Sequence, residues 1–246
     1  MFLNNKKLEI NFTTNVPGLV EDSEIQPQPA KNFYPSWWAK TPYSVPSQDT
    51  EYKLLLQKKS TIKACPSFPQ YFNQGYVIPA WCDMKFIYSK EQDRYEWDAG
   101  RTPNPFGMSI HSNPQFLDHT DFVFQGETCT FIFKADSPWR VVTPKGYSVL
   151  QLPLFYHFNQ SWISLPGIVD TDVFHEVNIQ IAYFKNNEEV IIKKGTPLAH
   201  YIVFKRSNYL MDVKYDEEFN YRQSSAYNRV STKFKGGYLK LKRDDK

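Results

Sequence analysis

Cysteine is scarce in this chain, with three cysteines among 246 residues. Cys65, Cys82 and Cys129 are widely spaced and form no C-x-x-C pair. An odd number of isolated cysteines indicates reduced thiols in a cytosolic setting. We therefore expect them to pack as small apolar side chains in a core, and not to act as ligands.

Long apolar runs and nucleotide-binding loops are also lacking. No run approaches the roughly 18 apolar residues of a membrane helix, so we expect no membrane span. Residues 1–14 are polar and mixed, and we expect no leading hydrophobic segment. The sequence contains neither a P-loop nor G-x-G-x-x-G. A net charge of +3 indicates no polyanionic partner by itself.

Aromatic residues and prolines, by contrast, are abundant. Aromatic residues make up 17% of the chain and prolines number 17, whereas alanines are few. This composition argues against a helical protein. The length is sufficient for a substantial core. We predict a mainly β protein, either one large domain or one domain with extensions.

The most regular part of the chain is residues 165–206. Apolar and polar residues alternate over residues 177–182, and this period of two indicates a strand with one buried face. Residues 190–192 and 198–204 have the composition of two further strands, each preceded by a short polar turn. Because the links are short, we predict an antiparallel meander and not a βαβ unit.

Three short motifs rich in turn residues lie within residues 139–206. They are Thr143-Pro144-Lys145-Gly146-Tyr147, Gly167-Ile168-Val169-Asp170 and Gly195-Thr196-Pro197-Leu198-Ala199-His200. In order and spacing they resemble the trimeric dUTPase and dCTP deaminase family. The resemblance implies a dUTPase-like β-clip fold, in which short strands form bent antiparallel hairpins.

The same resemblance implies candidate site residues and reveals departures from the family. Asp170 stands where a dUTPase keeps the aspartate that activates water. With Asp172 it would be catalytic, with Mg²⁺ as cofactor, in a nucleotide enzyme; the other interpretation of Asp170 is a turn residue that caps local N–H groups. Val173 replaces a family tyrosine, and residues 151–155 replace the phosphate-binding stretch. Gln180 stands where the deaminases need a glutamate, and an amide cannot transfer a proton.

A longer pattern spans most of residues 30–206. Its segments ACPSFPQYFNQGYVIPAWCD, PWRVVTPKGYSVLQLP and LPGIVDTD resemble a family encoded by tailed phages. This resemblance implies a viral origin and carries no activity. We expect the protein in the host cytoplasm during infection, with the virion as the other expected location.

Both ends differ from the β-rich body, which we place at residues 51–210. Residues 1–50 carry closely spaced prolines and aromatic residues, which predict an extended arm that packs on its own domain or on a neighbouring subunit. Residues 211–246 form a basic, tyrosine-rich extension, with nine basic and five acidic residues from Lys214 onward. Such a segment suits single-stranded nucleic acid or a subunit groove, and we favour packing on the body or subunit contact.

Several short elements are predicted by local pattern. Helical turns are expected at 36–40 and 68–72, and strands at 61–64, 76–78, 83–88, 122–124, 130–133 and 139–142.

A metal site is an alternative. His119 and Asp121 form an H-x-D pair, and His175 follows at the spacing of a 2-His-1-carboxylate iron site. These residues would bind Fe(II) in a 2-oxoglutarate oxygenase. Against this, the β-clip turn also explains His175, and no arginine follows it before Arg206 to hold 2-oxoglutarate.

Three hypotheses follow from these patterns. The first is a non-catalytic phage protein without a cofactor, which acts through protein–protein contacts in the virion or its assembly. Its partners would be copies of itself, preferably in a trimer, or other phage proteins. The second is a nucleotide-binding or nucleotide-hydrolysing enzyme, and the third is the iron oxygenase.

Overall fold

The computed structural model describes residues 8–46, 58–89, 91–92, 94–99, 108–111, 123–124, 127–129, 131–157, 159, 161–185 and 187–215. The chain divides into two compact units. The first comprises Met1–Phe33 and Gln74–Arg206, and the second comprises Tyr34–Asn73 and Ser207–Lys246. The boundaries expected at residues 50 and 210 stay a prediction.

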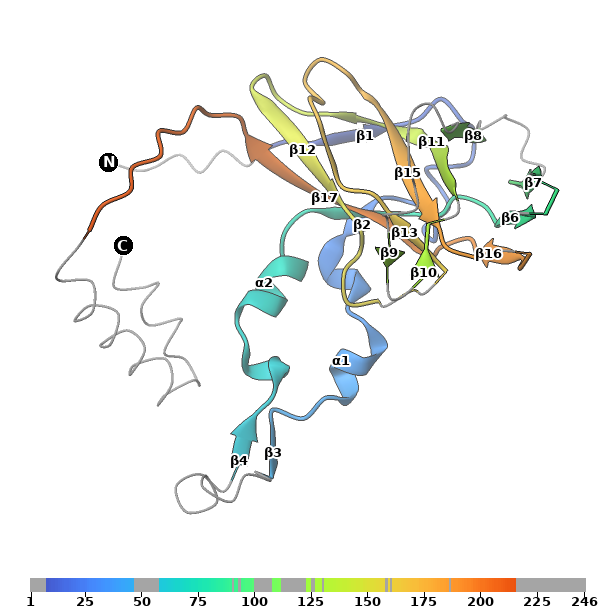
Figure 1. Ribbon diagram of the computed structural model, residues 1–246. Helices are drawn as coiled ribbons and strands as arrows, with labels where there is room; N and C mark the ends of the chain where they lie inside the picture. Colours follow the sequence, from blue (N-terminus) through green and yellow to red (C-terminus); the bar gives the residue numbers. More distant parts are fainter. Residues whose placement is uncertain are drawn as a thin grey trace. The chain divides into compact units, whose positions relative to one another are not determined.

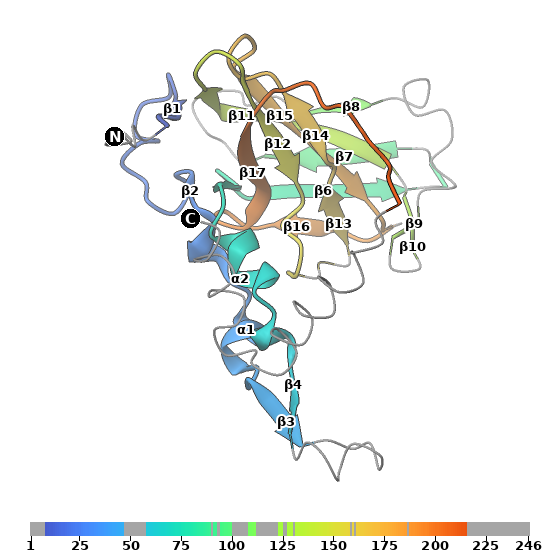
Figure 2. The ribbon, with the colours of Figure 1, turned by 90° about the vertical axis from the view of Figure 1, so that its left-hand side faces the viewer.

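The first sheet is built around the long strand β11 (Phe131–Val142), which pairs along one side with β15 (Glu176–Tyr183). On its other side, β11 pairs with β8 (Met108–His111) and β1 (Asn11–Thr13). β13 (Trp162–Ser164) extends the sheet beyond β15. Figure 1 and Figure 2 both show β11 and β15 running side by side.

The second sheet contains the motifs that resemble a β-clip. Its order is β14 (Gly167–Val169), β12 (Tyr147–Leu152), β17 (Pro197–Lys205), β5 (Tyr76–Pro79) and β2 (Gln28–Pro29). Every pairing in it is antiparallel. The sheet therefore joins the predicted body to a strand from the N-terminal arm.

The remaining strands of the first unit form a small sheet and a hairpin. β6 (Met84–Ser89) pairs with β16 (Val190–Ile192) and β7 (Arg94–Asp98). β9 (Val123–Phe124) pairs with β10 (Glu127–Thr128). Because these pairings too are antiparallel and the described helices are short, the predicted mainly β fold class is confirmed.

One apolar core receives side chains from all three larger sheets. Phe133 of β11, Ile179 of β15 and Tyr201 of β17 are buried in it together with Phe86 of β6. The rings of Phe86 and Phe133 lie 4.5 Å apart between centroids. The alternation read from the sequence puts these apolar side chains on the inner faces of the sheets.

The predicted meander is wrong. β15, β16 and β17 follow one another in sequence, but each belongs to a different sheet. β15 pairs with β11 and β13, β16 pairs with β6, and β17 pairs with β12 and β5. A period of two indicates which face of a strand is buried and does not identify its partner, so strands from distant parts of the chain could take these places.

The two strands predicted at 130–133 and 139–142 are one continuous strand, β11. Its register against β15 shifts between Asp136 and Arg140. Pro138 lies in this interval, and proline has no N–H for the ladder, so it is tolerated at a bulge. The Ser137 hydroxyl accepts a hydrogen bond from the Trp139 N–H at 3.1 Å and supports the bulge.

In the second unit, both predicted helical turns are present. The first is α1 (Ser36–Lys40), which is followed by the strand β3 (Ser44–Pro46). The second is α2 (Ser67–Phe72), which is preceded by the strand β4 (Lys58–Ser60). β3 and β4 pair with each other. Aromatic rings fill this unit: Trp38 stacks on Phe68 with centroids 4.0 Å apart. Rings of the arm thus pack, half-buried, against their own chain.

The strand predicted at 61–64 is wrong, because residues Ile62–Ala64 form a 3-10 helix. The hydroxyl of Thr61 accepts from the Lys63 N–H at 3.3 Å and caps this helix. A threonine that bonds its own backbone favours a helix start over an extended strand.

The three cysteines form no disulfide. Cys82 and Cys129 are buried, and burial raises the pKa of each thiol to about 11, as expected of cysteines that pack as apolar side chains. Within the described ranges, no helix is long and apolar enough to cross a membrane.

Candidate functional site

The two aspartates selected from the sequence lie in the tight turn between β14 and β15. The N–H groups of Val173 and Phe174 both donate to the carbonyl oxygen of Asp170, at 2.9 and 2.8 Å. The side chain of Thr171 is buried, and its hydroxyl lies 2.7 Å from that of Thr143. These contacts fix the backbone that carries both carboxylates.

Both carboxylates contact the side chain of Arg206, which directly follows β17. Arg206 donates from Nη1 to Asp172 Oδ1 at 2.8 Å and from Nη2 to Asp172 Oδ2 at 2.5 Å, the bidentate geometry of a strong ion pair. Nη1 also lies 3.0 Å from Asp170 Oδ1 and 2.9 Å from Ser148 Oγ. The Ser148 hydroxyl donates to Asp170 Oδ1 at 2.6 Å. We refer to Ser148, Asp170, Asp172 and Arg206 as the Arg206 clamp.

Backbone groups complete the clamp. The Gly146 N–H donates to Asp172 Oδ2 at 2.8 Å, and the Arg206 N–H donates to the Gly146 carbonyl oxygen at 2.8 Å. Gly146 precedes β12, Asp172 follows β14, and Arg206 follows β17. The clamp therefore ties together three neighbouring strands of one sheet at the same end.

The electrostatics of the clamp favour a structural role. The side chain of Asp172 is only 4% exposed, and hydrogen bonds from Arg206 and then from the Gly146 N–H lower its pKa to about 2. The same bond to Asp172 raises the pKa of Arg206. A general base works best with a pKa near the operating pH. Asp172 is therefore a poor base, and Asp170 Oδ1 already accepts from Ser148 and Arg206.

The residues predicted for an iron site are only partly described. His119 and Asp121 lie outside the described residues, and the iron site stays a prediction. The ring nitrogen Nδ1 of His175 lies 2.9 Å from the carbonyl oxygen of Thr171, so this histidine supports the β14–β15 turn. Among the residues that the structure describes, no group of three His, Cys, Asp or Glu side chains could hold a metal ion.

Arg206 is the central residue that the sequence interpretation missed as a site residue. In the oxygenase hypothesis it was only an arginine that lies too far from His175 in sequence to hold 2-oxoglutarate. The available signal was only its place directly after the last apolar run, residues 198–204. Only the β12–β17 register, which pairs Tyr147 with Lys205, brings the next residue, Arg206, to Gly146.

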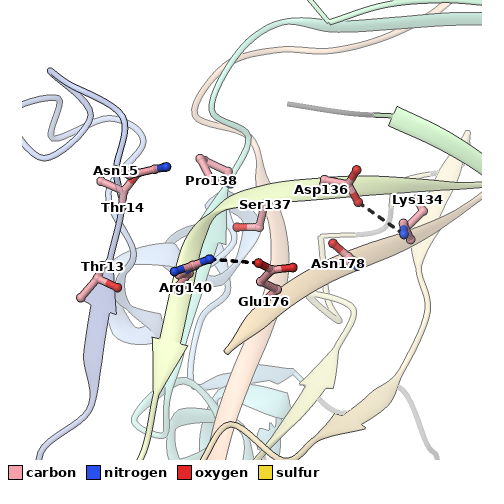
Figure 3. A pocket seen from close by; sticks show the side chains of 10 residues that line it. All are labelled: Thr13, Thr14, Asn15, Lys134, Asp136, Ser137, Pro138, Arg140, Glu176 and Asn178. Atoms are coloured by element: carbon pink, nitrogen blue, oxygen red, sulfur yellow. Dashed lines mark hydrogen bonds and ion pairs between the residues drawn. The ribbon is translucent and has the colours of Figure 1, made fainter. Parts of the chain in front are cut away.

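A polar hollow of about 540 Å³ lies over β11 and β15, on the face opposite the core (Figure 3). Two ion pairs contribute to it: Arg140 Nη2 lies 3.1 Å from Glu176 Oε1, and Lys134 Nζ lies 3.6 Å from Asp136 Oδ1. Each cation thus faces a carboxylate, and the four charges cancel. Such a lining can hydrogen-bond a neutral polar molecule, but it offers no excess of cations to a triphosphate.

Comparison with known proteins gives structural neighbours only. A mutant dUTPase of phage phi11 of S. aureus matches with a TM-score of 0.32 and 13% identity, covering 59% of this chain and 84% of that chain. A mutant dUTPase of Staphylococcus bacteriophage 80alpha matches with the same TM-score and identity, covering 60% and 84%. No family model and no curated protein matches the chain. Both structural neighbours are phage dUTPases, the family that the motifs in residues 139–206 resemble.

Proposed function

We propose that this protein acts through protein–protein contacts, as a self-associating component of a phage virion or of its assembly. The observation that carries the proposal is the segment Ser207–Tyr215, which follows β17 and Arg206. It has no regular secondary structure. Its apolar side chains Tyr209, Leu210, Met211, Val213 and Tyr215 are between 84% and 96% exposed. An apolar surface this exposed is typical of a segment that docks on a protein partner.

The Arg206 clamp supports the same proposal. Asp172 is held by Arg206 in a bidentate ion pair, and Asp170 shares one carboxylate oxygen with the same guanidinium group, so both acidic side chains contribute to a structural network. The clamp anchors the residue immediately before Ser207. The exposed segment therefore leaves the body from a fixed point, which suits a docking arm.

Self-association is the specific form of this proposal. The dUTPase resemblance favours three copies, and head-to-tail docking of one arm per copy generates a ring where the rotation between copies closes. The proposed site of action is the host cytoplasm during infection, with the virion as the second proposed location. Residues 216–246, where most of the basic extension lies, are outside the described residues.

The first prediction concerns the mass of the full-length protein in solution. We expect the wild type to have the mass of three chains by light scattering. Met211→Asp should lower the average mass towards one chain, because a charge at the centre of the apolar segment cannot be buried without a partner. Val173→Asp is the control, since it introduces the same charge at an exposed apolar residue outside the segment. A wild-type protein that stays a single chain at all concentrations would contradict the proposal.

Nucleotide addition distinguishes the proposed structural role from the nucleotide-enzyme hypothesis. We expect no change in the melting temperature when dUTP and Mg²⁺ are added at millimolar concentration. A ligand at 100 times its Kd stabilises the folded state by about 2.7 kcal/mol, which a melting curve detects readily. A stabilisation that Asp170→Asn removes would identify Asp170 as a nucleotide-site residue and count against a purely structural role.

A further inference from the structure

A second cavity, of about 370 Å³, lies within the first unit. Its lining comes from the loop between β12 and β13, from β13 itself and from the start of β17. Small-molecule sites in proteins have volumes of about 300–1,000 Å³. The cavity is therefore large enough to hold a small organic molecule.

The wall of this cavity is mostly apolar. Leu154, Trp162 and Leu198 belong to it and are buried, whereas Phe155 is 48% exposed. Among the described residues of the lining, none is a lysine, arginine, aspartate or glutamate. An ion that enters such a place loses its hydration and finds no counter-ion, which is costly. The lining therefore selects a neutral molecule.

The cavity is also rich in rings. Four of the residues that line it have aromatic side chains, namely Phe155, Tyr156, His157 and Trp162. Aromatic rings attract one another in offset-stacked and edge-to-face arrangements, and these contacts add to the free energy of burial. A saturated ring of the same size gains the burial without this addition. The lining therefore favours an aromatic ligand over an aliphatic one.

The loop that supplies three of these rings is held in an unusual conformation. Tyr156 has a φ of 74°, in the left-handed region that residues other than glycine rarely adopt. The ring of His157 anchors the loop, with Nε2 2.8 Å from the carbonyl oxygen of Phe33. Such backbone strain persists only where surrounding contacts impose it, and it is frequent at binding sites. Here it accompanies a half-exposed phenylalanine in the cavity lining.

Asn159 gives the lining a polar group of defined orientation. Its side-chain oxygen accepts hydrogen bonds from the N–H groups of Ser161 and Trp162, at 2.8 and 3.2 Å. These two donors determine which end of the amide is the oxygen. The amide nitrogen donates no hydrogen bond within the described part of the chain. A carbonyl oxygen on a ligand can accept from this group in place of water.

We propose that the cavity between β13 and the start of β17 binds a small neutral aromatic molecule that carries a carbonyl group. The ring would pack among the aromatic side chains of the lining, and the carbonyl oxygen would accept from the Asn159 amide. This inference goes beyond the proposed function and does not depend on self-association.

The test compares three probes of similar size on the full-length protein. Benzamide has the ring and a neutral carbonyl group, benzoate replaces the amide with a charge, and cyclohexanecarboxamide replaces the aromatic ring with a saturated one. The readout is the NMR shift of the Trp162 indole N–H, because Trp162 lies in the cavity wall. We expect a saturable shift with benzamide, binding weaker by about threefold or more with cyclohexanecarboxamide, and no shift with benzoate.

Two variants test the assigned contacts. Phe155→Ala removes a ring from the lining, and Asn159→Asp keeps the oxygen that accepts from the backbone but removes the N–H donors. Each should weaken benzamide binding by about threefold or more. Phe174→Ala is the matched control, because Phe174 is 54% exposed and lies on the β14–β15 turn, outside the cavity lining. It should leave benzamide binding unchanged. Since both altered side chains are exposed to solvent, the melting temperatures should stay close to that of the wild type.

Several results would overturn this inference. They are the absence of a benzamide shift, an equal shift with benzoate, and equal benzamide affinity in the wild type and Phe155→Ala. A Trp162 shift that depends on protein concentration without any probe would identify a polypeptide as the occupant and would overturn it too. Light scattering on the same samples tests the proposed function separately: a wild type that is always a single chain contradicts self-association and leaves the benzamide result unaffected.

Discussion

Gly75→Ala should unfold at a much lower urea concentration than the wild type, with a loss of about 2–5 kcal/mol in the free energy of unfolding. Gly75 has a φ of +71°, which costs an L-residue about 1–2 kcal/mol. A Cβ at this position would lie 2.0 Å from the carbonyl oxygen of Tyr201. That oxygen belongs to the buried strand β17, and forcing it aside adds about 1–3 kcal/mol.

The position of Gly75 explains why the backbone cannot yield. Its carbonyl oxygen accepts from the Ala30 N–H at 3.1 Å, and the next residue begins β5. Gly18→Ala is the control, because Gly18 has a φ of +80° and no atom within 4 Å of the added methyl group. It should lose only the conformational part, about 1–2 kcal/mol. Equal losses for the two variants would show that the contact with β17 is unimportant.

Arg206→Ala should have the second large effect, because it leaves Asp172 buried without its principal partner. Removing one member of a half-buried, bidentate pair destabilises a protein more than breaking an exposed pair. Arg140→Ala is the control, since it breaks the exposed pair with Glu176. We expect a clearly lower melting temperature for Arg206→Ala and almost no change for Arg140→Ala. Arg206→Lys should be intermediate, because lysine keeps the charge and loses the bidentate geometry.

The effect of Arg206→Ala should also depend on pH. The clamp lowers the pKa of Asp172 from an ordinary 3.8 to about 2. The stabilisation is therefore complete above about pH 4 and is lost as the pH falls towards 2. The difference in melting temperature between wild type and Arg206→Ala should shrink over this interval. A difference that stays constant from pH 5 to pH 2 would mean that Asp172 does not supply the stability.

Individual strands and helical turns could be predicted where the signal lies within a few neighbouring residues. The alternation over residues 177–182 and the β-branched residues 190–192 correspond to β15 and β16, and Pro35 is followed by the expected helical turn α1. Sheet membership could not be predicted in this way. The partners of β15 and β17 are chosen by burial among distant segments, and the short links between them do not force them to pair with each other.

The candidate site was predicted only in part for the same reason. The turn motif selected Asp170 and Asp172 by resemblance, and the structure places both in one network. Whether they act as catalytic groups or as structural ones depends on what faces them. That partner, Arg206, is 34 residues away from Asp172 in sequence and reaches it only through the pairing of β12 with β17.

The long sequence separation between the paired strands β5 and β17 affects how the protein folds during its synthesis on the ribosome. His200 contacts Gln74, just before β5, across 126 positions of the chain. At about 5–20 residues per second, synthesis takes roughly 6–25 s to supply the strand on which β5 pairs. During that time β2 is the one partner strand of β5, among the described strands, that has already been made. The apolar residues of β5 therefore lack their β17 partner until that strand emerges, and we expect the yield of folded protein to depend on the chaperones of the cell that makes it.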